Sequence, residues 1–236
     1  MDQSDQVVVL MVPFQAQGHL NQLLQLSCLI SSYGLPVYYV GSAIHNRQAK
    51  TRANGLNAND VAKIHFHDIP TPPFDSPPPN PNSSNKFPEQ LHPAWEAMLS
   101  LRKPIACYLQ ETSEKARRVI VVHDPMMALV VQDVSTIPNA ESYAFNCTSA
   151  FSQVTFLWRA LGKQVPTEHL KKLPSFTDGF PDKVQDLNAV ERLMVSEEGD
   201  EIRKRAEELA ATVRQATQEG GASRLELDSF IAHIMR

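Results

Sequence analysis

This 236-residue chain has no large excess of charge of either sign. It contains 22 Lys and Arg and 26 Asp and Glu, which give a net charge of −4. A protein that coats nucleic acid or an anionic membrane needs a strongly basic surface, so neither partner is expected. Long apolar runs are also missing. The longest extends from Val7 to Phe14, far short of the ~20 residues that a membrane-spanning helix needs. The polar first residues contain no basic segment of a secretory signal.

Cysteine is scarce as well. Cys28, Cys107 and Cys147 are widely spaced and form no CxxC motif, which excludes a disulfide scaffold or a zinc knuckle. Together with the missing signal, this predicts a cytoplasmic protein. Two Asn-x-Ser/Thr triplets, at Asn82 and Asn146, are accordingly not expected to carry glycans.

Short apolar runs alternate with helical patterns and predict an α/β fold with a parallel, doubly wound sheet in the strand order 3-2-1-4-5. A helix after Gly18 is expected to end at Gly34, in the manner of a glycine C-cap. The expected strands are residues 7–12, 36–40, 63–69, 119–122 and 142–145. The other expected helices are residues 45–54, 89–116 (broken or kinked near Pro104) and 151–161.

The composition changes at two places. Nine of the 17 prolines lie between Pro70 and Pro93, which predicts a long loop of a kind that is usually functional or disordered. After residue 186 the chain is charged and helical, and Ser223 to Glu226 matches a capping box that would open the last helix. We expect two parts, residues 1–187 and a helical tail at residues 188–236 docked on them. The tail's apolar stripe consists of Ile202, Ala206, Leu209, Val213 and Ala216.

His19 follows the first predicted strand and Asp124 directly follows the fourth. In the predicted order these strands are neighbours about 4.8 Å apart, so both side chains are expected at one crevice beyond the strand ends. An imidazole whose second nitrogen is held by a carboxylate is a general base near neutral pH. No nucleophile motif such as GxSxG accompanies the pair, so this base would act on a substrate hydroxyl. The alternative is structural, with His19 capping a helix and Asp124 forming a turn before Pro125.

Other patterns are weaker. His65, His67 and Asp68 resemble part of a metal site, but no further ligand is evident, so structural roles are favoured and no metal is expected. Gly18 is the only glycine where a nicotinamide-binding fold has G-x-G-x-x-G, which disfavours an oxidoreductase. Five aromatic residues are candidates for the lining of a ligand pocket, although aromatic residues at such positions more often fill the core: Phe14, Phe87, Trp95, Phe151 and Trp158.

Three segments carry a resemblance to a known family. Residues 8–22, VVLMVPFQAQGHLNQ, resemble the opening of the plant UDP-dependent glycosyltransferases. Residues 35–49, which contain LPVYYVG and HNRQA, and residues 66–74, FHDIPTPPF, are similar to the zeatin O-glucosyltransferases, including the cis-zeatin type. The resemblance extends over residues 7–186 and, separately, over residues 189–236.

This resemblance implies the N-terminal half of a GT-B glycosyltransferase, a Rossmann-like domain that holds a cytokinin-like small-molecule acceptor. It implies that His19 is the base and Asp124 its orienting partner in an inverting transfer from UDP-glucose or UDP-xylose, with no cofactor and no metal. The acceptor-binding residues expected on this basis are Phe14, Gly18, His19, Phe87 and Phe151.

The sequence also departs from the family. The donor-binding signature, which opens with Trp and contains His-Cys-Gly-Trp-Asn-Ser, is absent, and the only tryptophans are Trp95 and Trp158. Residues 187–236 are too few for a second Rossmann-like domain, so we expect most of the donor domain to be missing. Two hypotheses remain: a UDP-glycosyltransferase by family, or a monomeric fragment that binds an acceptor without glycosylating it.

Overall fold

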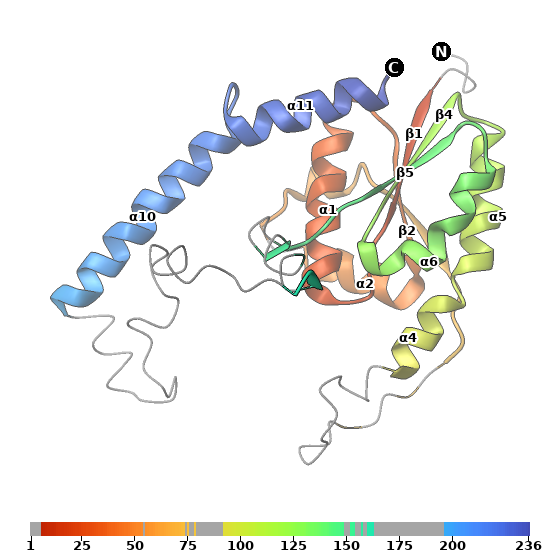
Figure 1. The fold of residues 1–236 in the computed structure, drawn as a ribbon, viewed down its shortest axis with the longest axis horizontal. Coiled ribbons are helices and arrows are strands. Elements are labelled where there is room, and N and C mark those ends of the chain that lie inside the picture. Colours follow the sequence, from red (N-terminus) through yellow and green to blue (C-terminus); the bar gives the residue numbers. More distant parts are fainter. Residues whose placement is uncertain are drawn as a thin grey trace. The chain divides into compact units, whose positions relative to one another are not determined.

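The computed structural model contains a five-stranded parallel sheet in the order β3-β2-β1-β4-β5 (Figure 1). The order and the parallel pairing confirm the sheet predicted from the sequence. β1 is buried along its whole length, because it has a strand on either side and helices over both faces. The strands are β1 (Val7–Val12), β2 (Val37–Ser42), β3 (His65–Ile69), β4 (Arg118–His123) and β5 (Ala140–Ala144).

The structure describes residues 6–236 apart from residues 54, 74, 76–77, 79–91, 149–151, 154–156, 158–159 and 163–195. The chain divides into two units, residues 1–147 with Met235, and residues 148–234 with Arg236. The predicted boundary between residues 187 and 188 falls in a segment outside the described residues and stays a prediction.

Helices cover both faces of the sheet in the first unit. Figure 1 shows α1 on one face, and α5 on the other face together with α4 and α6. The helices of this unit are α1 (Gln17–Ser31), α2 (Ala43–Thr51), α3 (Ala58–Val61), α4 (His92–Leu99), α5 (Arg102–Ser113) and α6 (Ala128–Val131), with 3-10 helices at η3 (Pro125–Met127) and η4 (Gln132–Thr136).

Alternate residues of β1 point to opposite faces of the sheet, and both sets are buried. Val8, Leu10 and Val12 belong to a hydrophobic core that also contains Ile105 and Leu109 of α5. On the other face, Leu20, Leu23, Leu24 and Ile30 of α1 are fully buried. Burial on both faces explains why the sequence of β1, VVVLMV, is continuously apolar rather than alternating.

The two ends of α1 are held in different ways. At its C-terminal end α1 stops at Ser31 with Ser32 as its C-cap, three residues before the predicted end at Gly34. Gly34 lies in the turn that follows and adopts a φ of +79°, which a residue with a Cβ rarely adopts. Near its N-terminal end the hydroxyl of Tyr39 donates to the carbonyl of Leu20 at 2.8 Å. Burial raises the pKa of the Tyr39 hydroxyl, which therefore stays a donor. This bond ties the first turns of α1, which include His19, to β2.

The helical segment that ends near Ser113 is interrupted near Pro104, as predicted. α4 ends at Leu99 and α5 begins at Arg102. A continuous helix would need an N–H at position 104 to reach the carbonyl of Ser100, and proline has none. In the first turn of α5 this N–H would have no partner within the helix, so proline is tolerated there.

Asn46 of α2 is fully buried and joins α2 to two strands. Its amide nitrogen donates to the carbonyl of Gly41 at 3.3 Å, to the carbonyl of His67 at 2.9 Å and to Asp68 Oδ1 at 2.8 Å. Gly41 leaves room for this amide, because a Cβ at position 41 would lie 3.0 Å from Asn46 Oδ1. The side chain therefore fixes the position of α2 relative to the carboxyl-terminal ends of β2 and β3.

The second unit contains α10 (Glu197–Thr217) and α11 (Ala222–Ile234). Ser196 caps α10, since its Oγ accepts the N–H of Gly199 at 3.1 Å. Within the predicted apolar stripe of α10, Ile202 is 40%, Leu209 65% and Val213 54% exposed. Docking of this stripe on the sheet domain stays a prediction.

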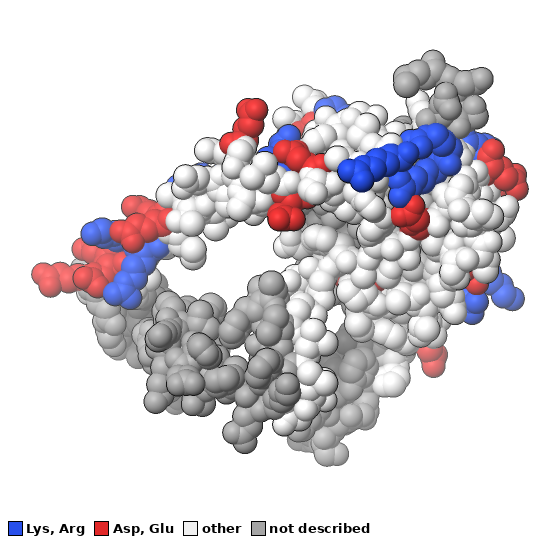
Figure 2. All heavy atoms as spheres, turned by 45° about the horizontal axis from the view of Figure 1, so that its top comes forward, with Lys and Arg blue, Asp and Glu red and all other residues white. Residues whose placement is uncertain are grey.

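Charged side chains of both signs gather at one end of α10, at the left of Figure 2. Ion pairs one turn apart join Arg203 to Asp200 and Arg205 to Glu201. Exposed pairs of this kind contribute little to the stability of the helix.

The predicted capping box at Ser223 is wrong, because α11 begins at Ala222. The N–H of Leu225 donates to the carbonyl of Gly221 at 2.9 Å, which places Gly221 at the N-cap. Only glycine fits there, since a Cβ would clash with the carbonyl oxygens of Gln215 and Ala216. The close approach of Gly221 to the last turn of α10 therefore determines where α11 starts.

Two predicted segments lie largely outside the described residues. Of the helix predicted over residues 151–161, residues 152, 153, 157 and 160 are helical and most others are not described. Most of the proline-rich loop between Pro70 and Pro93 is likewise not described.

Candidate active site

The pairing of β1 with β4 brings two distant residues to one end of the sheet. Val12, the last residue of β1, is paired with His123, the last residue of β4. Asp124 follows and donates its backbone N–H to the Val12 carbonyl at 3.1 Å. After β1 the chain enters α1, whose third residue is His19. The strand register therefore places His19 and Asp124 beyond the carboxyl ends of neighbouring strands.

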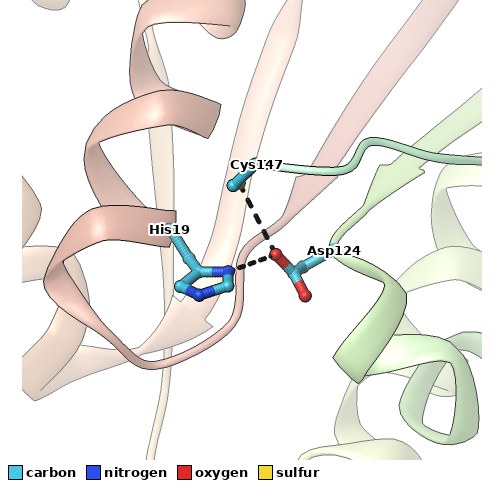
Figure 3. A group of neighbouring side chains, drawn as sticks. All are labelled: His19, Asp124 and Cys147. Carbon is cyan, nitrogen blue, oxygen red and sulfur yellow. Dashed lines mark hydrogen bonds and ion pairs between the residues drawn. The ribbon is translucent and has the colours of Figure 1, made fainter. Parts of the chain in front are cut away.

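His19 Nδ1 lies 2.6 Å from Asp124 Oδ2 (Figure 3), which confirms the predicted proximity. The carboxylate is enclosed, with 1% of the Asp124 side chain exposed, whereas 32% of the His19 side chain is exposed. An ionised carboxylate is only an acceptor, so Nδ1–H is the donor and Nε2 carries the free lone pair. In Figure 3 this second ring nitrogen lies on the side away from Asp124.

Asp124 also has the turn role that the sequence left open as an alternative. Its Oδ1 accepts the backbone N–H of Met126 at 2.9 Å and so caps the 3-10 helix η3. Its other oxygen, Oδ2, is the one bound to His19. The two roles use different oxygens, and the turn fixes the carboxylate in the orientation that the imidazole needs.

Cys147 was not predicted as part of this group. Its Sγ lies 3.6 Å from Asp124 Oδ2 (Figure 3). Ala144 at the end of β5 is paired with His123 of β4, and Cys147 follows three residues later. The strand order places Asp124 beside His19, and by the same rule it places the residues after β5 near Asp124. The position of Cys147 after the fifth strand could therefore have been predicted from the sequence.

Aromatic rings pack beside the imidazole. The ring of Phe14 meets the ring of His19 edge to face at a centroid distance of 5.2 Å, and Trp95 of α4 lies 6.0 Å from Phe14. The predicted binding residue Phe14 therefore touches His19. Phe87 and Phe151, also predicted to bind the acceptor, lie outside the described residues.

Gly18 precedes His19 in the first turn of α1 and faces open space. A Cβ at this position would meet no atom within 4 Å. Its φ is not in the left-handed region, so the backbone does not require glycine. The fold itself therefore supplies no steric reason for glycine at this position.

His19, Asp124 and Cys147 each offer a donor atom of the kind that binds metals, and these atoms lie within 4.8 Å of one another. A zinc ion bound by both His19 and Asp124 would hold their donor atoms about 3 Å apart or more, given metal–ligand bonds of about 2.0 Å. The 2.6 Å distance between Nδ1 and Oδ2 is instead that of a short hydrogen bond. Burial, followed by the charge of Asp124, raises the pKa of the Cys147 thiol to about 12, so it is protonated near neutral pH. The geometry is therefore that of a hydrogen-bonded group.

The weaker metal candidate has structural roles. His65 stacks on Tyr38 at 5.0 Å between ring centroids, and His67 stacks on Tyr108 at 3.8 Å. Asp68 accepts a hydrogen bond from the Asn46 amide. These contacts agree with the structural interpretation favoured in the sequence.

A comparison with family profiles decides the family. The profile of the family described as "Glycosyltransferase, N-terminal domain" matches residues 5–215. The chain belongs to this glycosyltransferase family. The resemblance drawn from the segments around Gly18 and His19 is thereby confirmed.

Curated relatives of this glycosyltransferase domain have related names. The chain is 47% identical over 170 residues to zeatin O-glucosyltransferase of Phaseolus lunatus, a match that covers 72% of this chain and 36% of that protein. It is 42% identical over 176 residues to zeatin O-xylosyltransferase of Phaseolus vulgaris, covering 74% and 37%. It is 39% identical over 158 residues to cis-zeatin O-glucosyltransferase 1 of Zea mays, covering 66% and 34%. The chain thus spans about a third of the length of these relatives.

Solved structures of glycosyltransferases also match the domain. UGT73P12 of Glycyrrhiza uralensis, complexed with glycyrrhetinic acid 3-O-monoglucuronide, has a TM-score of 0.48 at 16% identity, covering 69% of this chain and 33% of that one. UGT89C1 of Arabidopsis thaliana, complexed with UDP-L-rhamnose, has a TM-score of 0.46 at 20% identity, covering 64% and 35%. Within the described part of the glycosyltransferase domain, every helix is too short or too polar to cross a membrane.

Proposed function

We propose that this chain is the acceptor-binding part of a UDP-sugar-dependent O-glycosyltransferase whose acceptor is a hydroxylated cytokinin of the zeatin class. The observation that carries the proposal is the hydrogen bond of His19 to Asp124, which leaves Nε2 free as a base at the carboxyl end of the sheet. The family supports the reaction class. The names of the relatives, zeatin O-glucosyltransferase and zeatin O-xylosyltransferase, support the acceptor and the two candidate sugars.

The proposed chemistry is a single displacement. His19 Nε2 removes the proton of the acceptor hydroxyl while the hydroxyl oxygen attacks the anomeric carbon of the sugar, and the bond from that carbon to UDP breaks. Attack from the face opposite to UDP inverts the configuration. As His19 becomes an imidazolium, its bond to the Asp124 carboxylate becomes ionic and stronger, which favours proton transfer. No cofactor is part of this proposal, because the UDP-sugar is a co-substrate.

Binding without transfer is the second candidate. It is supported by the missing His-Cys-Gly-Trp-Asn-Ser signature and by coverage of 36% of the first relative. Without the contacts that hold the uridine, the phosphates and the sugar, the donor is not positioned for attack. We therefore propose that this chain by itself binds the acceptor and does not bind the donor.

We further propose a monomeric, cytosolic protein. Cys28, Cys107 and Cys147 are all free thiols, which supports a reducing compartment. Sedimentation velocity of the purified chain tests the oligomeric state, and a single species near 26.3 kDa is the expected result.

Calorimetric titration tests the binding proposal. The purified chain is titrated separately with trans-zeatin, cis-zeatin and UDP-glucose. We expect saturable binding of a zeatin isomer and no measurable binding of UDP-glucose. Saturable UDP-glucose binding would contradict the fragment candidate and favour an enzyme with its own donor site.

Two controls locate the acceptor at His19. A cytokinin without the side-chain hydroxyl should bind about three- to tenfold more weakly, because one hydrogen bond is lost. His19→Ala should remove this preference for the hydroxylated compound. If His19→Ala binds zeatin as tightly as the original chain does, and with the same preference, the acceptor does not contact His19 and the proposed chemistry fails.

Gly18→Ala should separate stability from binding. The added Cβ meets no atom, so the helix should gain about 0.5–1 kcal/mol of stability from the better helix former. If the acceptor occupies the open space beside Gly18, its affinity should fall about tenfold through steric conflict. Thermal unfolding and zeatin titration measure the two effects.

A matched control lies in the turn that ends α1. Gly34→Ala, at a φ of +79°, should destabilise the chain by about 1–2 kcal/mol and leave the intrinsic affinity for zeatin unchanged. An unchanged affinity in Gly18→Ala would show that the acceptor does not pass over the first turn of α1.

A further inference from the structure

Two donors share one oxygen of the buried carboxylate. Asp124 Oδ2 lies 2.6 Å from His19 Nδ1 and 3.6 Å from Cys147 Sγ, while Oδ1 is occupied by the N–H of Met126 (Figure 3). In Figure 3 the thiol and the imidazole approach this oxygen from different elements, the segment after β5 and the helix α1. The proposed mechanism accounts for the bond from His19 and leaves the thiol without a role.

The thiol acts as a donor in this contact. Burial, and after it the adjacent Asp124, raises the pKa of Cys147 to about 12 and keeps it protonated near neutral pH. An ionised carboxylate offers only lone pairs, so the hydrogen between sulfur and oxygen belongs to Cys147. The contact is a weak hydrogen bond, which is within the reach of sulfur.

We propose that Cys147 is a positioning residue that tunes the bond between His19 and Asp124. Two donors on the same oxygen compete for its electron density, so the thiol weakens the bond from His19 by a small amount. A hydroxyl in its place would compete more strongly, and a methyl group would not compete. The importance of this tuning for sugar transfer rests on the proposed function, whereas the competition itself follows from the contacts at Oδ2.

The test compares Cys147→Ala with Cys147→Ser in the full chain. The readout is the ¹⁵N chemical shift of His19 Nδ1, detected through the carbon-bound ring protons, together with the low-field Nδ1–H resonance where it is visible. We expect the bond to strengthen in Cys147→Ala, which moves Nδ1–H downfield, and to weaken in Cys147→Ser, which moves it upfield. Cys107→Ser changes an exposed cysteine of α5 and should move neither resonance.

The decisive result is that the Nδ1–H resonance moves in opposite directions in the two variants. A change in packing alone would not make the direction of the shift depend on the hydrogen-bond donor strength of residue 147. Equal shifts in the same direction, or no shift in Cys147→Ala, would overturn the proposal. Thermal unfolding of each variant confirms that the resonances come from folded protein. If Cys147→Ala does not fold, Cys147→Ser is compared with the original chain instead. The proposal then requires the Nδ1–H resonance of His19 to move upfield in Cys147→Ser.

This outcome is independent of the proposed function. Zeatin titration of the original chain decides whether the acceptor binds, and its failure would not alter the resonances of His19. If zeatin does bind, Cys147→Ala should bind it about twofold more tightly and Cys147→Ser about twofold more weakly, because a stronger bond at Nδ1 makes Nε2 a better acceptor.

Discussion

Replacing Asp124 with asparagine is expected to move the imidazole proton of His19 from Nδ1 to Nε2 and so to remove the basic nitrogen that the proposed chemistry needs. Asparagine has one acceptor oxygen, and the N–H of Met126 occupies it as it now occupies Oδ1. The amide NH₂ then replaces Oδ2 and faces Nδ1 of His19, where a second donor cannot be tolerated. The ring responds by changing its tautomer.

The ¹⁵N shifts of the His19 ring nitrogens measure this inversion directly, with Nδ1 changing from a pyrrole-like to a pyridine-like shift. Asp124→Ala is the matched variant. It removes the cap of η3 along with both bonds at Oδ2, and should lower the free energy of unfolding by about 2–4 kcal/mol. Asp124→Asn keeps the cap and should lose less. If the asparagine variant retains Nδ1–H, the carboxylate does not orient His19 and the proposed general base fails.

Asn46→Ala is expected to be among the most destabilising polar substitutions in the first unit. The side chain is fully buried, and its amide nitrogen serves two carbonyl oxygens and the Asp68 carboxylate. Alanine leaves the carbonyl oxygens of Gly41 and His67 without this donor, whereas the exposed Asp68 carboxylate can still bind water. We expect the free energy of unfolding to fall by about 2–4 kcal/mol and Tm to fall by about 5–15 °C.

Asn46→Asp should be worse than Asn46→Ala, although its shape is nearly that of the original residue. A carboxylate at this position would face the carbonyls of Gly41 and His67 and the charge of Asp68, with no donor among them. Urea unfolding of both variants ranks them. Asn59→Ala, at an exposed position of α3, is the control and should change stability by less than about 0.5 kcal/mol. A milder effect of aspartate than of alanine would mean that the Asn46 amide nitrogen does not face these oxygens.

The meeting of His19 and Asp124 was predictable because it depends on rules that operate at the level of whole strands. Apolar runs separated by helical patterns require a parallel sheet, and the common strand order makes the first and fourth strands neighbours. Residues that directly follow those strands then lie at the same edge, whatever the packing around them. Cys147 follows β5 under the same rule, but a single cysteine in an irregular segment has no pattern that marks it as part of a site.

Other features could not be predicted, because they depend on where individual atoms lie. The contact of Trp95 with Phe14 requires the position of α4 in space, and the sequence pattern predicted a break or kink near Pro104 without its direction. The start of α11 at Ala222 depends on how tightly Gly221 approaches the end of α10, and the capping-box pattern that begins at Ser223 was misleading. In both cases the deciding interaction is a close approach between segments.

The sequence by itself determined the class of fold, the order of the five strands, the glycine in the turn after α1 and the pair of residues brought together at the strand ends. These follow from periodicity, from chain connectivity and from the handedness of crossovers, which are all local or topological properties. Only the tertiary structure decided that Asp124 divides its two oxygens between a turn and an imidazole, and that a thiol shares the second of them. Hydrogen bonds depend on distances of a few tenths of an ångström, and these are set by the packing of β1, β4 and β5 together with α1.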